Sequence, residues 1–595
     1  MNTMRVQPYQ VIPTATAVTD PLRYKEEEED SNKFKTNSNV YDTFDATTWT
    51  KGEVQPPEYR DVWFGVIFWV QLAVIVLLAV LFATGILPTA TSSSSSSLAF
   101  SSPPTAHSVH HHGRALWSMV SSTNSSPRFL TAASASGSTS VNNYHEPSID
   151  EQELMRVASA AFWSFLLSLI ATPVITLATL SYMYQHAITL IQQSLIFGIV
   201  INLVFAIMLL VQGLILGALV PLIVALFMVC YIQAVWHRIP YAASNIRTAI
   251  ACVQDNLGMT WLSLAAIPLY FGWLALWMYT MAETLDSPYM LSQINATQIP
   301  MHGPNGYQQY TVQQRASGIW WLILIFFLLS LYWTIQVIGN TWHTTIAGTV
   351  GTWWFVPAEA FGCCSDALTS SMSRSLTFSF GSICFGSLIV AIIQTLQALL
   401  RMVASSSSSS NDSGANNDNR ECNAILYCLI QCLLDWLEQL AEYFNKWAFI
   451  YVGLYGYSYL EASKNVMTLF EQRGWSTIIS DNLSARMLGF VSLAIGLFES
   501  LVAAIVTYVL LFRQDDVGGL VVLSAMIALL VGLALSSIML GVISSAVDTI
   551  VVLFAEAPAE FQHNFPELSR EMQQAWIQAW PDIFTPSTLT PVVVV

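Results

Sequence analysis

Long apolar runs alternate with polar segments along the chain and predict a bundle of membrane-spanning helices. Crossing the ~30 Å hydrocarbon core of a bilayer takes about 20 apolar residues in a helix. Nine segments qualify: 62–87, 157–180, 194–212, 214–236, 260–282, 318–340, 376–402, 485–512 and 517–545. Helices satisfy their own backbone hydrogen bonds in lipid, so runs of this length indicate helices and not barrel strands. We predict an all-α polytopic membrane protein with about ten transmembrane helices and cytoplasmic N- and C-termini.

Two further stretches, 341–356 and 446–470, are ambiguous. Residues 318–356 could form one helix of about 58 Å at ~1.5 Å per residue, or two spans divided at the polar break 339–343. In the first interpretation 446–470 must cross the membrane, and in the second it need not. Both give ten spans, but they place the Ser/Asn linker 404–420 on opposite sides.

The first span predicts the orientation of the chain. Residues 1–61 are polar and are expected to form a disordered cytoplasmic tail. The apolar run that follows is too long for a cleaved signal peptide and is expected to serve as its own anchor. The link 237–250 then lies inside, and its His237, Arg238 and Arg247 agree with the positive-inside bias.

Two sequons support this orientation. Asn124 lies in the Ser-rich loop 88–152, and Asn295 lies in the loop 283–317. Both loops fall on the outer side when the N-terminus is inside, so we expect both asparagines to be glycosylated. The transporter domain is expected to cover 62–565, and the cytoplasmic tail 566–595.

Residues 424–445 are amphipathic. The leucines recur at helical spacing, while Asp435, Glu438 and Glu442 occupy other faces. This pattern favours a helix in the membrane interface, although a helix packed on the bundle would show the same pattern.

Composition removes several classes of function. Hydrophobic residues make up 54% of the 595 residues and charged residues only 10%, so the surface must face a lipid bilayer. The net charge of −16 argues against a nucleic-acid partner, which would need a basic stripe. The chain has no Walker loop, and its His107–His112 cluster lies in low-complexity sequence. We therefore expect no ATP-driven pumping, no metal and no cofactor.

Four ordered motifs resemble a known family. They are HTTIAGTVGTWWFVP (343–357), FSFGSICFGSLIVAIIQ (378–394), NKWAFIYVGLYGYSYLEASKN (445–465) and GVISSAVDTIVVLFAEAP (541–558). They are similar to those of the choline transporter-like family, especially its fungal and algal pH-nine-sensitive branch. The resemblance implies ten helices, internal termini and transport of choline or a related amine, with the plasma membrane as the expected location.

A site for a quaternary ammonium needs aromatic faces and a carboxylate, because such an ion donates no hydrogen bond. Trp333 and Gln336 are one turn apart beside Tyr332, deep in segment 318–340, and could line a pore or simply pack. Tyr455 and Tyr459 alternate with glycines and could form an aromatic wall near a close backbone approach.

One carboxylate lies near the middle of a predicted span. Glu499 is in segment 485–512, where an ionisable group costs ~3 kcal/mol and is a functional candidate by default. The alternative is a protonated or hydrogen-bonded core residue. Asp548 ends the last span and could cap a helix or bind at the inner mouth.

Two rival functions remain open at this point. A membrane-embedded acyltransferase could use the isolated match from His145 to Asp150, but no second catalytic element accompanies it. A non-transporting scaffold would explain the long loops, but not the polar residues at mid-membrane depth.

Overall fold

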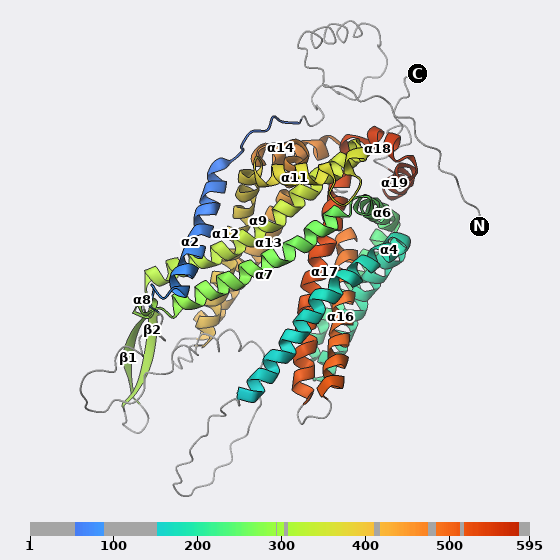
Figure 1. Ribbon diagram of the computed structural model, residues 1–595. Coiled ribbons are helices and arrows are strands. Elements are labelled where there is room, and N and C mark those ends of the chain that lie inside the picture. Colours follow the sequence, from blue (N-terminus) through green and yellow to red (C-terminus); the bar gives the residue numbers. More distant parts are fainter. Residues whose placement is uncertain are drawn as a thin grey trace, which may run out of the picture. The chain divides into compact units, whose positions relative to one another are not determined.

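The computed structural model describes residues 54–88, 151–292, 294–302, 308–409, 417–473, 483–511 and 517–581. These residues are almost entirely helical (Figure 1), and eight of their helices are long and apolar enough to cross a membrane. The expected all-α polytopic class is confirmed. In chain order the elements are α2 (Val62–Ala83), α4 (Glu151–Val211), α5 (Ile215–Val235), η1 (Trp236–Arg238), α6 (Ile239–Asp255), α7 (Gly258–Leu285), α8 (Pro288–Ser292), β1 (Ile294–His302), β2 (Gln308–Ala316), α9 (Gly318–Phe355), α10 (Pro357–Ala360), α11 (Asp366–Leu376), α12 (Phe380–Ser409), α13 (Asn417–Tyr455), α14 (Tyr459–Arg473), α16 (Leu483–Leu511), α17 (Val517–Glu556), α18 (Pro558–Asn564) and α19 (Pro566–Ala579).

Helix α4 consists of two helices joined at a kink. The backbone of His186 leaves the helical region there, with φ −117° and ψ 25°. A straight helix of 61 residues would extend about 90 Å, three times the hydrocarbon thickness. The apolar segments 157–180 and 194–212 lie on either side of the kink, as two spans require. If α4 crosses twice and α13 crosses once, the total is ten, and this count stays a prediction.

Helix α9 is continuous through the polar break 339–343, so the interpretation with one long helix agrees with the structure. Side chains of the break bond to neighbouring helices instead of ending the helix. Asn340 Nδ2 donates to Ser387 Oγ of α12 at 2.9 Å, and Trp342 Nε1 donates to the carbonyl oxygen of Leu262 at 2.7 Å.

The ambiguous stretch 446–470 is not one element. Its first part completes α13, which ends at Tyr455 before Gly456, a residue with a φ of +79° that suits glycine. The amphipathic segment 424–445 is therefore the middle of a longer helix. Its polar face meets α12, because Gln397 Nε2 donates to Glu438 Oε2 at 2.7 Å and to Asp435 Oδ1 at 3.0 Å. The structure thus favours packing on the bundle over a position in the membrane interface.

Both expected tails contain ordered residues. Residues 54–61, at the end of the predicted N-terminal tail, lie against the bundle, where Asp61 Oδ2 accepts hydrogen bonds from Ser382 Oγ at 2.6 Å and from the Tyr459 backbone N–H at 3.1 Å. The C-terminal segment begins with α19, where buried Trp576 donates to Asn245 Oδ1 at 2.9 Å. Residues 1–53, the loop segment 89–150 with Asn124 and the His145–Asp150 match lie outside the described residues.

The long helices form two groups. Helices α2, α7, α9, α12 and α13 pack together, and α4, α5, α16 and α17 form the second group. Helix α17 also contacts α7, α9 and α13, so it joins the two groups. The short helices α11, α14, α18 and α19 lie at one end, and α8 with the β1–β2 hairpin at the other (Figure 1). This hairpin pairs Ile294 with Ala316 and carries Asn295 on its first strand.

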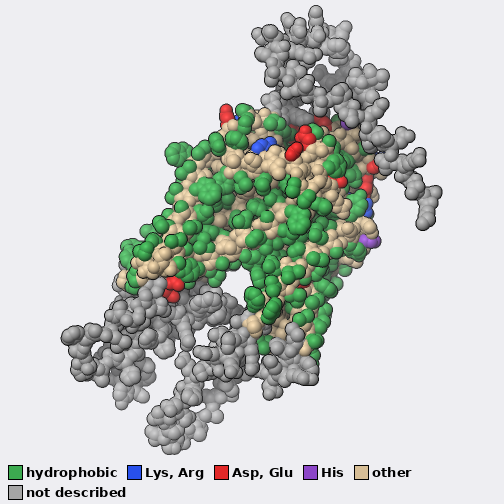
Figure 2. Space-filling view, in the orientation of Figure 1, with side chains coloured by type: hydrophobic (Ala, Val, Ile, Leu, Met, Phe, Trp, Pro, Cys, Tyr) green, Lys and Arg blue, Asp and Glu red, His purple; other side chains and the backbone are tan. Residues whose placement is uncertain are grey.

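The outer faces of the helices are apolar. Figure 2 shows hydrophobic side chains over most of the visible described surface, with charged side chains mainly near the end that carries the short helices. Such a surface suits a bilayer and supports an integral membrane protein.

The orientation of α12 leads to a topology prediction. Helices α2 and α12 begin side by side, because Ser382 contacts Asp61, and they pack along each other, so Ser409 lies toward the end of the bundle at which α2 finishes. In a variant lacking native cysteines, Ser408→Cys should react with an impermeant maleimide on intact cells. Glu571→Cys, on α19, is the control and should react only after permeabilisation. Protection of Ser408→Cys until permeabilisation would contradict an external linker.

Candidate functional site

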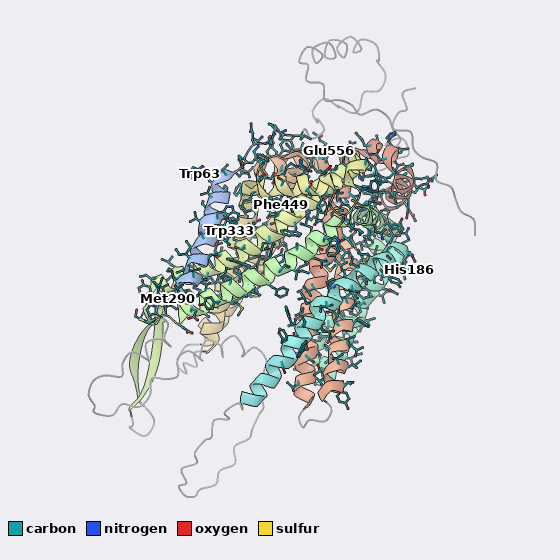
Figure 3. The ribbon with its side chains drawn as sticks, viewed as in Figure 1. Trp63, His186, Met290, Trp333, Phe449 and Glu556 are labelled. Carbon is teal, nitrogen blue, oxygen red and sulfur yellow. The ribbon has the colours of Figure 1, made fainter. Side chains whose placement is uncertain are left out.

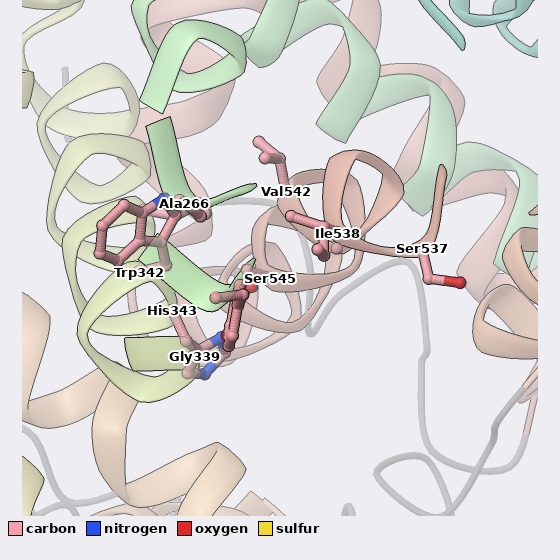
Figure 4. A pocket seen from close by; sticks show the side chains of 11 residues that line it. Ala266, Gly339, Trp342, His343, Ser537, Ile538, Val542 and Ser545 are labelled. Atoms are coloured by element: carbon pink, nitrogen blue, oxygen red, sulfur yellow. The ribbon is translucent and has the colours of Figure 1, made fainter. Parts of the chain in front are cut away.

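Two adjacent cavities lie where α17 meets the first helix group. The larger, which we call the polar cavity, has a volume of about 330 Å³. It is lined by Gln336, Asn340, His343, Val390, Glu442, Asn445, Lys446, Gly541, Ser544, Ser545 and Asp548. The smaller, the aromatic cavity, has a volume of about 170 Å³ (Figure 4). It is lined by Ala266, Tyr270, Gly339, Trp342, His343, Ile346, Ser537, Ile538, Gly541, Val542 and Ser545.

Helical spacing aligns the polar side chains of the larger cavity. On α9, Gln336, Asn340 and His343 recur after four and three residues, so they share one face of the helix. On α17, Ser545 and Asp548 have the same relation. Helices α12 and α13 complete the lining. Four helices from distant parts of the sequence therefore surround one polar space.

The charge of the polar cavity favours a cation. Glu442 and Asp548 contribute two carboxylates, and Lys446 contributes one ammonium group. Lys446 Nζ lies 3.0 Å from Asp548 Oδ1 and 4.2 Å from the centre of the Trp447 ring. The lining therefore carries one more negative than positive charge when all three groups are ionised.

His343 connects three helices at the boundary of the two cavities. Its Nε2 lies 3.0 Å from the carbonyl oxygen of Lys446, and its Nδ1 lies 2.8 Å from Ser545 Oγ. A carbonyl oxygen only accepts, so the ring hydrogen belongs on Nε2. In the neutral ring Nδ1 then accepts from the Ser545 hydroxyl. This geometry ties α9 to α13 and to α17.

Of the residues predicted to bind substrate, Gln336 alone lines either cavity in the described structure. Trp333 is 3% exposed and packs on Phe68 and Phe380 between α2, α9 and α12 (Figure 3). Its Nε1 donates to the Cys384 carbonyl oxygen at 3.0 Å. Tyr332 packs against the same cluster. Trp333 and Gln336 therefore face different surroundings: Trp333 packs in an apolar cluster, and Gln336 lines the polar cavity.

The two predicted tyrosines have different surroundings. Tyr459 donates its hydroxyl to Asn445 Oδ1, and Asn445 lines the polar cavity while its Nδ2 donates to the Gly386 carbonyl oxygen at 2.9 Å. Tyr459 thus holds Asn445 in position without lining the cavity itself. Tyr455 packs on Tyr451, with ring centres 5.3 Å apart, away from both cavities.

The close backbone approach expected near these tyrosines is present. A Cβ on Gly453 would lie 2.5 Å from the Thr344 carbonyl oxygen, so a larger residue would push α13 away from α9.

Glu499 lies in the second helix group and lines neither cavity. It is 4% exposed and sits beside the hydroxyls of Ser168 and Thr172 on α4 and against Gly532 on α17. Neither carboxyl oxygen makes a hydrogen bond of ordinary geometry within the described part of the chain. The structure thus places a carboxyl group in an almost apolar helix interface.

The sequence interpretation missed Asn340, His343, Glu442 and Lys446 as cavity residues. The signal was present on α9, because Gln336, Asn340 and His343 form a polar stripe inside an apolar helix. The same polar residues at 339–343 also fit a break between two helices, so the sequence pattern alone does not identify them as cavity residues. No group of three or more metal-ligating side chains occurs among the described residues.

The packing of Trp333 makes a testable prediction. Trp333→Phe should lower the free energy of unfolding by about 1–3 kcal/mol, because the indole hydrogen bond to the Cys384 carbonyl is lost and the smaller ring leaves a void in this buried cluster. Thermal unfolding of purified protein measures this, with Trp320→Phe on the same helix as the control. A loss of choline affinity at unchanged stability would instead support the binding role predicted from the sequence.

Comparison with known proteins agrees with the four motifs. Residues 219–559 match the family described as plasma-membrane choline transporter. A CTL-like protein of Dictyostelium discoideum is 29% identical over 343 residues, which cover 58% of this chain and 53% of the relative. The PNS1 protein of Mycosarcoma maydis is 34% identical over 278 residues, or 46% of this chain and 50% of the relative. That of Gibberella zeae is 32% identical over 258 residues, or 43% and 45%.

The matched part of the chain thus spans about half the length of these curated relatives. The family match covers more than half of this chain and includes all four motifs and every residue of both cavities. The chain therefore belongs to the plasma-membrane choline transporter family, and its relatives include CTL-like and PNS1 proteins.

Proposed function

We propose that this protein transports choline or a related small organic amine across a membrane, and that this is the plasma membrane. The polar cavity is the substrate site, and transport proceeds by alternating access, either facilitated or linked to protons. The observation that carries this proposal is a cavity with excess negative charge at the junction of two helix groups. Family membership supports the same conclusion.

The size and lining of the cavity suit a small cation. Its volume of about 330 Å³ lies at the lower end of the ~300–1,000 Å³ range of ligand pockets. Glu442 and Asp548 attract a positive group, while the amides of Gln336 and Asn340 can bond to a substrate hydroxyl. A bulky or anionic substrate would fit this lining poorly.

The position of the cavity suits alternating access. Helix α17 belongs to the second group but contributes one wall, opposite α9, α12 and α13. A movement of the second group against the first would open or close this wall without disturbing the other three helices. His343 and Lys446 mark the contacts that such a movement must break, because both bond to α17.

Uptake by purified full-length protein in liposomes tests the proposal. Labelled choline should accumulate with saturation, and excess unlabelled choline should compete. Liposomes without protein give the background. Chemical conversion of the label without accumulation would instead identify the membrane-embedded enzyme considered above. If choline is neither taken up nor converted, the scaffold is the remaining function and the transport proposal is contradicted.

A further inference from the structure

The aromatic cavity differs chemically from the polar cavity beside it. Its walls are largely the apolar side chains of Ala266, Ile346, Ile538 and Val542 and the rings of Tyr270 and Trp342. Among its described lining residues none is an acid, a lysine or an arginine. The indole N–H of Trp342 is already used, because it donates to the Leu262 carbonyl oxygen. The other polar side chains of the lining are those of His343, Ser537 and Ser545. His343 and Ser545 bond to each other, and Ser537 bonds to Ser492, so the space offers aromatic faces and few free hydrogen-bond acceptors.

This chemistry discriminates between two classes of ammonium ion. A primary ammonium carries three N–H donors and loses hydrogen bonds when it leaves water for such a space. A fully alkylated ammonium has no donor to satisfy, and its methyl groups gain from contact with aromatic faces. The aromatic cavity should accept the second class and reject the first.

The two cavities are neighbours with a common wall. His343, Gly541 and Ser545 line both of them. A Cβ added to Gly541 would have no atom within 4 Å, so the backbone borders open space there. His343 stands at the boundary, where its bond to Ser545 ties α9 to α17 (Figure 4). Rotation of this side chain would break its hydrogen bonds to Ser545 on α17 and to the Lys446 carbonyl on α13, and would widen the connection between the cavities.

We propose that the aromatic cavity is a second station for the transported cation, selective for alkylated ammonium ions and reached from the polar cavity past His343. This inference rests on the proposed function. The polar cavity attracts any small cation by charge, and the aromatic cavity then distinguishes choline from unmethylated amines. The polar cavity thus attracts cations, and the aromatic cavity selects among them.

Filling the aromatic cavity tests the inference. Ala266 lines the aromatic cavity but not the polar cavity, and its side chain is 1% exposed. The test measures the affinities of purified full-length protein for choline and for ethanolamine, which differ in three methyl groups. In Ala266→Leu the preference for choline should fall about 30-fold, the value of one desolvated cation–π contact, while ethanolamine affinity stays unchanged.

The control is Gly272→Leu, which adds the same side chain to α7 at an exposed position with open space around it. It should alter neither affinity. If Ala266→Leu does not fold, Ala266→Val adds less volume and is judged by the same criterion. Equal weakening of both amines, or no change beyond the control, would overturn the second station. Absence of binding of either amine to the wild-type protein would contradict the proposed function itself.

Discussion

Choline uptake should fall at least tenfold when Asp548 is replaced by Asn. The substitution removes the carboxylate that lies 3.0 Å from Lys446 Nζ and leaves the cavity with one acid and one base. Two unit charges 4 Å apart interact by about 4 kcal/mol at an effective dielectric constant of 20. The side chains of Lys446 and Asp548 are 30% and 17% exposed, so water screens part of this energy. A loss of about 1.4 kcal/mol, or tenfold, is a conservative expectation.

Restoring the charge balance separates electrostatics from misfolding. The double variant Asp548→Asn/Lys446→Met keeps Glu442 and returns the lining to one net negative charge. It should recover much of the uptake lost in the single variant. Thermal unfolding must be measured in parallel, because breaking a buried ion pair alone can cost about 3–5 kcal/mol. Wild-type uptake in the single variant would exclude Asp548 from the substrate site.

Replacement of Glu499 should separate stability from transport. Glu499→Gln keeps the shape of the side chain and should leave the protein folded, yet uptake should fall and lose its dependence on pH. The described neighbours of this carboxyl group are Ser168 and Thr172 on α4 and Gly532 on α17, and none of these three side chains titrates. A proton relay requires a group that gains and loses a proton, and an amide cannot do so.

Glu499→Leu distinguishes a role in transport from a purely structural role, because the two roles predict different combinations of stability and uptake. A buried polar group without hydrogen bonds of ordinary geometry costs about 1–3 kcal/mol, so leucine should unfold at the same or a higher temperature than the wild type. Uptake should nevertheless fall at least as far as in Glu499→Gln. The control is Leu501→Ala, a lipid-facing change on the same helix. An unchanged rate and pH profile in a well-expressed Glu499→Gln would reduce Glu499 to packing.

The partial success of the predicted site has a geometric cause. Trp333 and Gln336 are three residues apart, so they lie about 60° apart around the helix axis. Both could face one cavity, and the spacing alone does not decide. In the structure α2 and α12 cover the Trp333 side, while Gln336 faces the junction with α13 and α17. The position of neighbouring helices made this choice.

The amphipathic pattern of 424–445 shows the same limitation. A polar face can meet water, lipid headgroups or other polar side chains, and the sequence pattern is identical in each case. Here Gln394 and Gln397 of α12 supply the partners of Glu438, so the acidic face points into the bundle. These partners lie 44 and 41 residues away along the chain.

The membrane class, the positions of most long helices and the family can all be inferred from the amino-acid sequence. Each of these depends on local information: the length of an apolar run that lipid requires, and short motifs that can be compared directly. Which faces of α9, α13 and α17 meet, and therefore which polar residues form a cavity, follows only from the packing of the helices. The physical reason is that His343, Lys446 and Asp548 become one site only when helices distant in sequence pack side by side, and helical periodicity describes one helix at a time.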